Sequence, residues 1–263
     1  VGTNDDKMLA IDAITGALKW SFQTGANISS SPKISDNKVY FGSSDSKFYC
    51  LNAQTGQLIW TYQTGAMINQ SGACLVNGKL YFGSRDGYLH CINAVNGSLN
   101  WKFGTGIISF ETSSPTIDNN IAYIGGWYNV PGFTIKGSVY AVNATTGTLI
   151  WEQLANTGFS SSPFVSNNRL YVTGDDLKIS ALNSSTGAIL WQKEILPNSS
   201  SPVEANGVVY VGGGGTGYVY ALDAASGNEV WKFRIPGALM TSSPLLIKFS
   251  GEIEYPGDSG IQD

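Results

Sequence analysis

The side chains capable of chemistry are few and far apart in this sequence. The three cysteines, Cys50, Cys74 and Cys91, include no adjacent pair and no C-x-x-C spacing. This pattern indicates neither a zinc site nor a disulfide framework and predicts buried free thiols. The single histidine, His90, stands where a related segment of the chain has tyrosine, in a strand, so a Ser-His-Asp triad is not credible. We therefore expect no catalytic residues.

Two further motifs are typical of ligand loops but lack the rest of the pattern. The segment 212–217, GGGGTG, has neither the Lys-Ser/Thr pair nor the following helix of a phosphate-binding loop. The acidic turns at 4–6 and 175–176 each offer two neighbouring carboxylates, whereas calcium takes about six to eight oxygen ligands. Hairpin turns explain these segments better, and we expect no metal site.

Composition excludes several classes of partner. The net charge is −4, with 15 Lys and Arg against 19 Asp and Glu, and without a basic cluster we expect no nucleic-acid partner. No apolar run is long enough to span a membrane, and no signal peptide opens the chain. A Lys-poor, Asn/Ser/Thr-rich composition favours an extracytoplasmic location. Six sequons agree with it, at Asn27, Asn69, Asn96, Asn143, Asn183 and Asn198.

A repeat of about 40 residues organises the chain. Six tryptophans recur at spacings of 40, 41, 50, 40 and 40 residues, and a glycine precedes each by four. An Asp or Asn four residues before the glycine can bond to the backbone ahead of it, and glycine tolerates positive φ, so each segment reads as strand, tight turn, strand. The tryptophans are Trp20, Trp60, Trp101, Trp151, Trp191 and Trp231, and the glycines are Gly16, Gly56, Gly97, Gly147, Gly187 and Gly227.

The rest of the period predicts four short antiparallel strands. Ser-Ser-Pro recurs at Pro32, Pro115, Pro163, Pro202 and Pro244, and after all but the last a tyrosine follows eight residues later. Asp-Ser or Asp-Gly then marks a two-residue hairpin, as in YFGSSDSKFY and YFGSRDGYLH. A four-stranded sheet of this size cannot bury both faces alone, so successive sheets must stack, and radial stacking gives an all-β propeller.

The tryptophans are expected to join neighbouring sheets. Each buried indole contributes about 3 kcal/mol. The residue before the turn is small in every repeat, which we interpret as a seat for the indole of a neighbouring sheet: Ala10, Cys50, Cys91, Ala141, Ala181 and Ala221. This gives two cysteines a structural role.

The segment A-x-[DN]-A-x-[TS]-G-x-x-x-W, together with Ser-Ser-Pro and V-Y-x-G-S-x-D-G, resembles the tryptophan-docking repeat of the PQQ-like β-propeller family. That family includes quinoprotein dehydrogenases, the lipoprotein of the outer-membrane assembly machinery, and surface or sensor domains. The resemblance covers essentially the whole chain. A dehydrogenase would require a vicinal disulfide, a central Trp and a Glu-Asn-Asp calcium set. No two cysteines are adjacent, and the acids near the presumed axis reduce to Glu111 and Glu204. We therefore expect neither PQQ nor calcium to be bound.

Departures from the repeat are the better guide to function. Trp101 to Pro115 is 14 residues against 12 from Trp20 to Pro32, and about eight residues are inserted between Tyr123 and Tyr140. Both departures lie in the fourth blade and open on the same face. They offer an aromatic patch with one acid and one base, which suits a protein or glycan partner: Phe110, Glu111, Trp127, Tyr128, Phe133 and Lys136. The alternative is that the insertion folds over its own blade and buries Trp127 as a lid.

These observations favour a non-catalytic, extracytoplasmic scaffold that binds a protein or glycan through loops on one face. Two alternatives stay open, a degenerate or truncated PQQ-dependent quinoprotein oxidoreductase and the sensor domain of a membrane receptor. We expect residues 1–263 to form one propeller domain with six visible repeats. The overlap in register between its two ends suggests part of a seven- or eight-bladed array.

Overall fold

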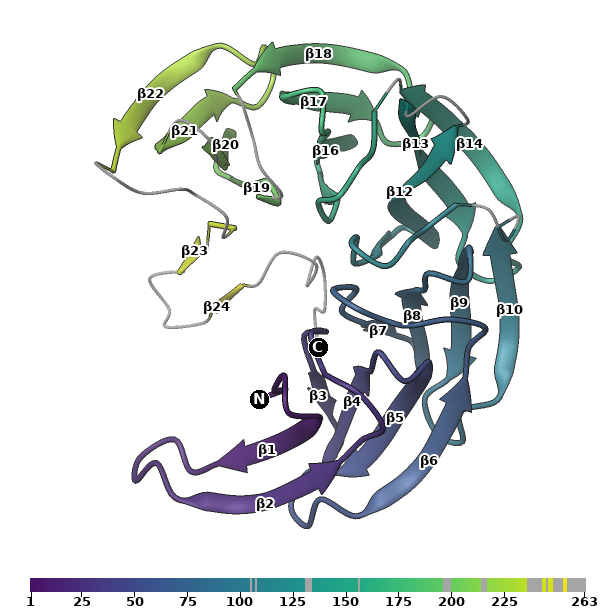
Figure 1. The fold of residues 1–263 in the computed structure, drawn as a ribbon. Coiled ribbons are helices and arrows are strands. Elements are labelled where there is room, and N and C mark those ends of the chain that lie inside the picture. Colours follow the sequence, from purple (N-terminus) through teal and green to yellow (C-terminus); the bar gives the residue numbers. More distant parts are fainter. Residues whose placement is uncertain are drawn as a thin grey trace. The chain divides into compact units, whose positions relative to one another are not determined.

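The computed structural model describes residues 1–104, 106, 108–130, 134–155, 157–195, 200–213, 217–235, 243–244, 246–247 and 253–254. All the regular elements in these ranges are β-strands (Figure 1). The chain forms two compact units, residues 1–115 and residues 116–263.

The first unit contains one two-stranded sheet and two four-stranded antiparallel sheets. The two-stranded sheet pairs β1 (Lys7–Ile11) with β2 (Leu18–Gln23), and Gly2 adds an isolated bridge to Met8. The second sheet runs in chain order through β3 (Lys33–Ser35), β4 (Lys38–Gly42), β5 (Lys47–Asn52) and β6 (Leu58–Gln63). The third runs through β7 (Cys74–Val76), β8 (Lys79–Gly83), β9 (Tyr88–Asn93) and β10 (Leu99–Gly104).

The second unit repeats the same four-stranded sheet three times. Its sheets are β11 (Thr116–Asp118), β12 (Ile121–Val130), β13 (Thr134–Asn143) and β14 (Leu149–Ala155); β15 (Phe164–Ser166), β16 (Arg169–Thr173), β17 (Lys178–Asn183) and β18 (Ile189–Glu194); and β19 (Val203–Ala205), β20 (Val208–Gly213), β21 (Tyr218–Asp223) and β22 (Glu229–Arg234). A last pair joins β23 (Leu246–Ile247) to β24 (Ile253–Glu254). The predicted four strands per repeat are confirmed.

Three kinds of turn connect the strands of a sheet. At Asx turns such as that of Asn52, the side-chain oxygen accepts bonds from the amides two and three residues ahead, and the glycine that follows adopts positive φ. The first two strands are joined by two-residue turns in which both residues have positive φ, as at Asp36 and Asn37.

The hairpin between the second and third strands corrects one expectation. We predicted a two-residue loop at Asp-Ser. Instead, Ser46 donates to the carbonyl of Ser43, Ser43 donates to the carbonyl of Lys47, and only Ser46 has positive φ. This is a three-residue loop, in which one left-handed residue closes a type I turn with a bulge. A two-residue turn would need positive φ at both residues (type I′) or at the first (type II′).

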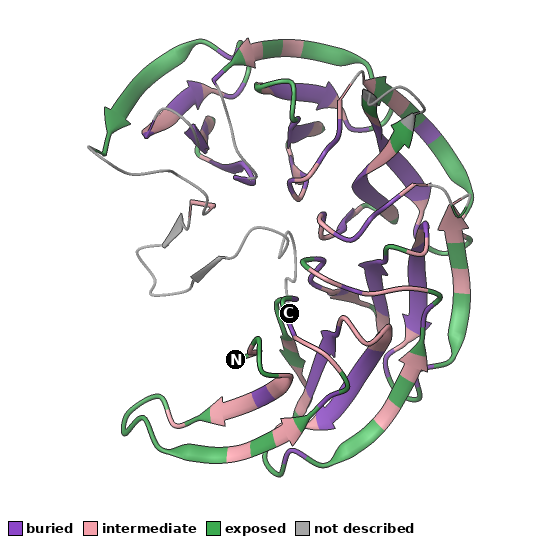
Figure 2. Cartoon of the chain, viewed as in Figure 1, coloured by how far each residue is buried: buried purple, intermediate pink, exposed green. Residues whose placement is uncertain are grey.

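Neighbouring sheets pack face to face within each unit. In the four-stranded sheets the second and third strands are mostly buried while the outer strand reaches solvent (Figure 2). In the first unit, Tyr40 and Phe48 of one sheet pack with Leu80 and Phe82 of the next. In the second, Ile179 packs in the same way with Val209 and its neighbours. The core therefore lies between sheets, as stacking predicted.

Tryptophans link consecutive sheets, but their seat differs from the one we predicted. Trp20 lies against Gly56 of the following repeat, where a Cβ would come within 2.7 Å of the indole, and Trp151 and Trp191 contact Gly187 and Gly227 in the same way. The small residue lies instead directly across the strand pair from the tryptophan of its own repeat, as Cys50 does from Trp60. The seat must be glycine because the indole approaches the turn backbone itself.

Candidate functional site

The insertion in the fourth repeat lengthens a hairpin. Strands β12 and β13 each have ten residues, and they pair from Ile121 with Asn143 to Val130 with Thr134. The corresponding strands β16 and β17 have five and six residues. The flanking strand β11 pairs with residues 121–123 of β12, and β14 pairs with β13 from Val142 to Gly137. Beyond these pairs, residues 128–130 and 134–136 form a two-stranded extension of the sheet.

The predicted aromatic residues are divided between the two faces of this hairpin. Trp127 pairs with Gly137, and Tyr128 pairs with Lys136. Successive side chains of a strand point to opposite faces, so Tyr128 and Lys136 share one face and Trp127 lies on the other. All three side chains are partly exposed. Phe133 lies outside the described residues.

Exposed apolar side chains accompany these residues. Ile135 is 46% exposed on the Trp127 face, and Leu154 is 64% exposed on the Tyr128 face, opposite Ser138. Most other exposed apolar residues recur at fixed places in the outer strands, as Leu58 and Leu149 do. The repeat explains those positions but not Ile135 and Leu154. An irregular apolar surface of this kind is typical of a binding site.

The link before the fourth repeat places Phe110 in the core of the first unit. Its side chain is fully buried, its amide donates to the carbonyl of Ser84, and a Cβ on Gly83 would overlap its backbone. The amide of Ile68 donates in the same way to the carbonyl of Ser43, and a Cβ on Gly42 would overlap the side chain of Ile68. Phe110 is therefore buried in the same way as Ile68, which has the same place in the segment that joins the two preceding sheets.

Glu111 belongs to a row of polar side chains. Ser44 donates to Asn69 (2.8 Å), and Asn69 donates to Oε2 of Glu111 (2.7 Å). Nε of Arg85 lies 3.7 Å from Oε1 of Glu111, and Nη1 lies 3.7 Å from Sδ of Met67. Glu111 is buried, whereas half of the Arg85 side chain reaches solvent. The row holds a guanidinium in place at the surface of the first unit.

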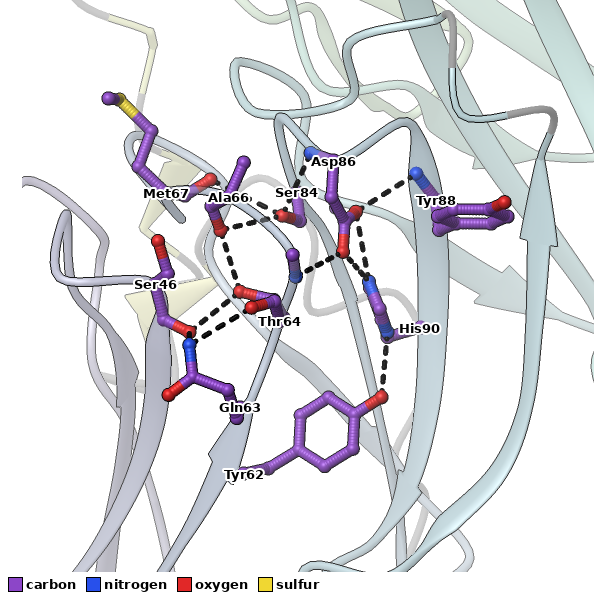
Figure 3. Close-up of polar contacts among 12 residues, drawn as sticks. Ser46, Tyr62, Gln63, Thr64, Ala66, Met67, Ser84, Asp86, Tyr88 and His90 are labelled. Carbon is purple, nitrogen blue, oxygen red and sulfur yellow. Dashed lines mark hydrogen bonds and ion pairs between the residues drawn. The ribbon is translucent and has the colours of Figure 1, made fainter.

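The sole histidine joins two sheets of the first unit (Figure 3). Nε2 of His90, in β9, lies 3.1 Å from both carboxylate oxygens of Asp86, and Nδ1 lies 3.1 Å from the hydroxyl of Tyr62 in β6. Nε2–H donates to Asp86, while Nδ1 accepts from Tyr62 when the ring is neutral and donates to it when the ring is protonated. The Gly65 amide also donates to Asp86 (2.9 Å). In the preceding sheet Tyr49 takes the place of His90, and its hydroxyl donates to Asp45.

This network is a structural contact and not a catalytic dyad. Burial by itself raises the pKa of Asp86, but the hydrogen bond and charge of His90, with the Gly65 amide and Ser84, hold it below its ordinary value. The side chain of His90 is only 2% exposed, so no substrate can reach it. We anticipated the Tyr position of His90 but not its partners. The recurring four-residue spacing, Asp45 to Tyr49 and Asp86 to His90, was the signal that could have found them.

The residues that a quinone and its calcium would need do not assemble in the described structure. The three cysteines are buried and form no disulfide, and burial raises the pKa of the Cys50 thiol to about 12. Among the described residues, no three His, Cys, Asp or Glu side chains converge to hold a metal ion. The donor set of the described residues therefore does not fit calcium, and the cysteines do not form the disulfide on which the quinone of such a dehydrogenase would lie.

The described part of the chain also contains no helix that could cross a bilayer.

Comparison with curated proteins finds partial relatives, among them an assembly factor and a hydrolase. An outer membrane protein assembly factor BamB from Legionella pneumophila is 30% identical over 132 residues, which are 49% of this chain and 32% of the relative. A tetrathionate hydrolase from Acidithiobacillus ferrooxidans is 26% identical over 137 residues, 49% of this chain and 28% of the relative. The matches thus span about a third of the length of these proteins.

Solved structures share the fold. BamB from Moraxella catarrhalis superimposes with a TM-score of 0.68 at 17% identity, over 91% of this chain and 80% of that one. Quinohemoprotein alcohol dehydrogenase from Comamonas testosteroni gives 0.67 at 18% identity, over 86% and 45%. These likenesses, at low identity, confirm the all-β propeller fold.

The family is decided by the match to a sequence model. The model described as outer membrane protein assembly factor BamB matches residues 1–130, 85–201 and 176–248. Together these ranges cover almost the whole chain, and they contain the tryptophan-docking repeats from which the resemblance was inferred. The chain belongs to the PQQ-like β-propeller family represented by that model.

Proposed function

We propose that this chain is an extracytoplasmic, non-catalytic propeller scaffold, one domain over residues 1–263, that binds a protein partner through the extended β12–β13 hairpin. The observation that carries the proposal is the hairpin itself. Its strands are longer than the corresponding strands of the other repeats. It presents Trp127, Tyr128 and Lys136 together with two exposed apolar residues, Ile135 and Leu154. Family membership and the names of the BamB relatives support a role in assembly.

Site-specific photo-crosslinking tests this proposal. A photoreactive amino acid replaces Ile135 or Lys136 in the full chain, and Ile59 is the control because it is 44% exposed but belongs to the periodic outer strand β6. We expect one protein of the cell envelope to crosslink at 135 and 136 and not at 59. The purified partner should then bind the chain and lose affinity for Ile135→Asp. Equal crosslinking at all three positions would contradict the proposal.

The quinoprotein alternative is tested separately. The purified chain is incubated with PQQ and Ca²⁺, and absorbance and dye reduction are followed. A spectral shift with dye reduction would favour the oxidoreductase over the scaffold.

A further inference from the structure

Two glycines bring the extended hairpin against the link that leads to the next sheet of the second unit. A Cβ on Gly137, in β13, would lie 2.6 Å from the carbonyl oxygen of Thr157 and 2.9 Å from Cα of Gly158. Backbone thus meets backbone, which only glycine permits at this separation. The contact fixes the link across the Trp127 face of the hairpin.

Three side chains from different segments converge at Gly158. A methyl group added there would lie 2.6 Å from Oδ2 of Asp175, 3.0 Å from Cβ of Trp127 and 3.5 Å from Cγ2 of Ile135. Trp127 and Ile135 come from β12 and β13, and Asp175 comes from the turn between β16 and β17. Trp127, Ile135 and Asp175 therefore meet around Gly158, where no room is left for a methyl group, and all three side chains reach the surface.

Asp175 does not accept the backbone hydrogen bond that closes the turn, as Asp86 does in the preceding unit. Its amide bonds to the carbonyl of Gly158, as the amide of Arg85 does to Met67, so Asp175 and Arg85 occupy the same place in the repeat. The turn itself is held by the next residue, Asp176, which accepts from the amide of Lys178. Asp86 accepts from the amide of Tyr88 in the same way.

The carboxylate of Asp175 has a hydroxyl neighbour but, within the described ranges, no counter-ion. Ser160 donates to it at 3.2 Å, and no Lys, Arg or His in the described ranges lies within 4.0 Å of it. Burial against the link and the charge of Asp176 raise its pKa, although Ser160 acts in the opposite direction. A cation beside Asp175 would relieve both effects.

We propose that Trp127, Ile135 and Asp175 bind a basic side chain, arginine or lysine, of the protein partner. The carboxylate pairs with the charge, the indole offers a cation–π contact, and the aliphatic stem lies along Ile135. Charge complementarity selects this occupant over an acidic or neutral segment. The inference rests on the proposed function for the existence of the partner, but the site can be tested without it.

NMR titration with two peptides is the test. The full chain, labelled with ¹⁵N, is titrated with acetyl-Gly-Arg-Gly-amide and with its citrulline counterpart, which has nearly the same shape but no charge. Seven indole N–H signals are expected, one for each tryptophan, and Trp127→Phe identifies the relevant one. We expect the arginine peptide to shift the Trp127 signal and the citrulline peptide to leave it in place.

Variants assign the binding to individual groups. Asp175→Asn keeps the shape and the Ser160 contact but removes the charge, and it should weaken binding at least about threefold, a loss in the range of exposed ion pairs and cation–π contacts. Gly158→Ala should weaken binding, because the added methyl group would push Asp175 away from Trp127. Glu229→Gln is the control, because it removes an equal charge from the exposed strand β22.

Three results would overturn the inference: equal shifts with both peptides, a response that avoids Trp127, or unchanged binding by Asp175→Asn. If the arginine peptide binds here but no protein crosslinks to the hairpin, the site stands and the proposed scaffold function fails.

Discussion

The glycine that receives a tryptophan should be far less replaceable than an identical glycine that receives none. Gly16 and Gly56 occupy the same turn of successive repeats, with φ of 72° and 71°. A Cβ on Gly56 would lie 2.7 Å from the Trp20 indole, whereas one on Gly16 has nothing within 4 Å. Replacing each by alanine therefore imposes the same backbone strain but adds a steric clash only at Gly56.

The two costs can be estimated separately. An L-residue in the left-handed region costs about 1–2 kcal/mol, offset in part because alanine also restricts the unfolded chain. We therefore expect Gly16→Ala to lower the free energy of unfolding by about 1 kcal/mol. At Gly56 overpacking adds about 1–3 kcal/mol. Displacement of the indole also weakens its 2.8 Å bond to the Ala53 carbonyl, worth about 1 kcal/mol. We expect a total loss of about 3 kcal/mol.

Urea unfolding followed by circular dichroism measures both values. The decisive control is the Trp20→Ala background, in which the obstacle is absent. There, Gly56→Ala should cost no more than Gly16→Ala, so the double-mutant cycle reports a coupling of at least about 1 kcal/mol. The reasoning fails if the two single variants are equally stable, or if removing Trp20 leaves the cost of Gly56→Ala unchanged.

Three further predictions concern the buried polar groups of the first unit. Because the folded pKa of Asp86 is lowered, its contribution to stability is present above the unfolded pKa of about 3.9 and is lost as pH falls through the folded value. The difference in urea midpoint between wild type and Asp86→Asn should therefore be clear at pH 7 and shrink below about pH 4. A gap that widened in acid would contradict this. The free energy of unfolding of His90→Tyr should stay within about 1 kcal/mol of wild type, because Tyr49 already makes the equivalent contact. His90→Ala should lose about 1–3 kcal/mol, because it leaves Asp86 without its partner. Equal losses for the two variants in thermal unfolding would show that the contact to Asp86 is unimportant. The pKa of Cys50 is raised to about 12, and all three thiols are buried. A disulfide exchange reagent at pH 8 should therefore label almost none of them in the native chain and all three in urea. Rapid labelling of the native chain would contradict this and place a thiol at the surface.

The repeat pattern predicted much of the fold because its signals are local. An Asx residue, a glycine and a tryptophan at fixed offsets require a particular turn whatever surrounds them, and the turn of Asn52 and Gly56 has the expected form. The hairpin at Asp45 escaped prediction in detail because the length of a loop depends on which residue adopts positive φ. Asp-Ser is compatible with two loops, and only the backbone shows that Ser46 alone does so.

The candidate site was predictable only as a departure from the repeat. The eight extra residues pointed to Trp127, Tyr128 and Lys136, but their alternation across β12 and β13 follows from the strand pairing. Asp175 was assigned to the turn by its sequence, and the structure brings it beside Trp127 through the close approach of Gly158.

The sequence by itself determined the period, the four strands of each repeat and the family, because these depend on contacts a few residues apart that recur six times. Only the tertiary structure decided which groups meet across segments. It placed Trp20 on the next glycine rather than on a small strand residue, linked His90 to Tyr62 across two sheets, and set Asp175 against the inserted hairpin. Those contacts join residues about 30 to 50 positions apart. At that separation the spacing of residues along the chain does not show which side chains meet, because the packing of one sheet on the next decides it.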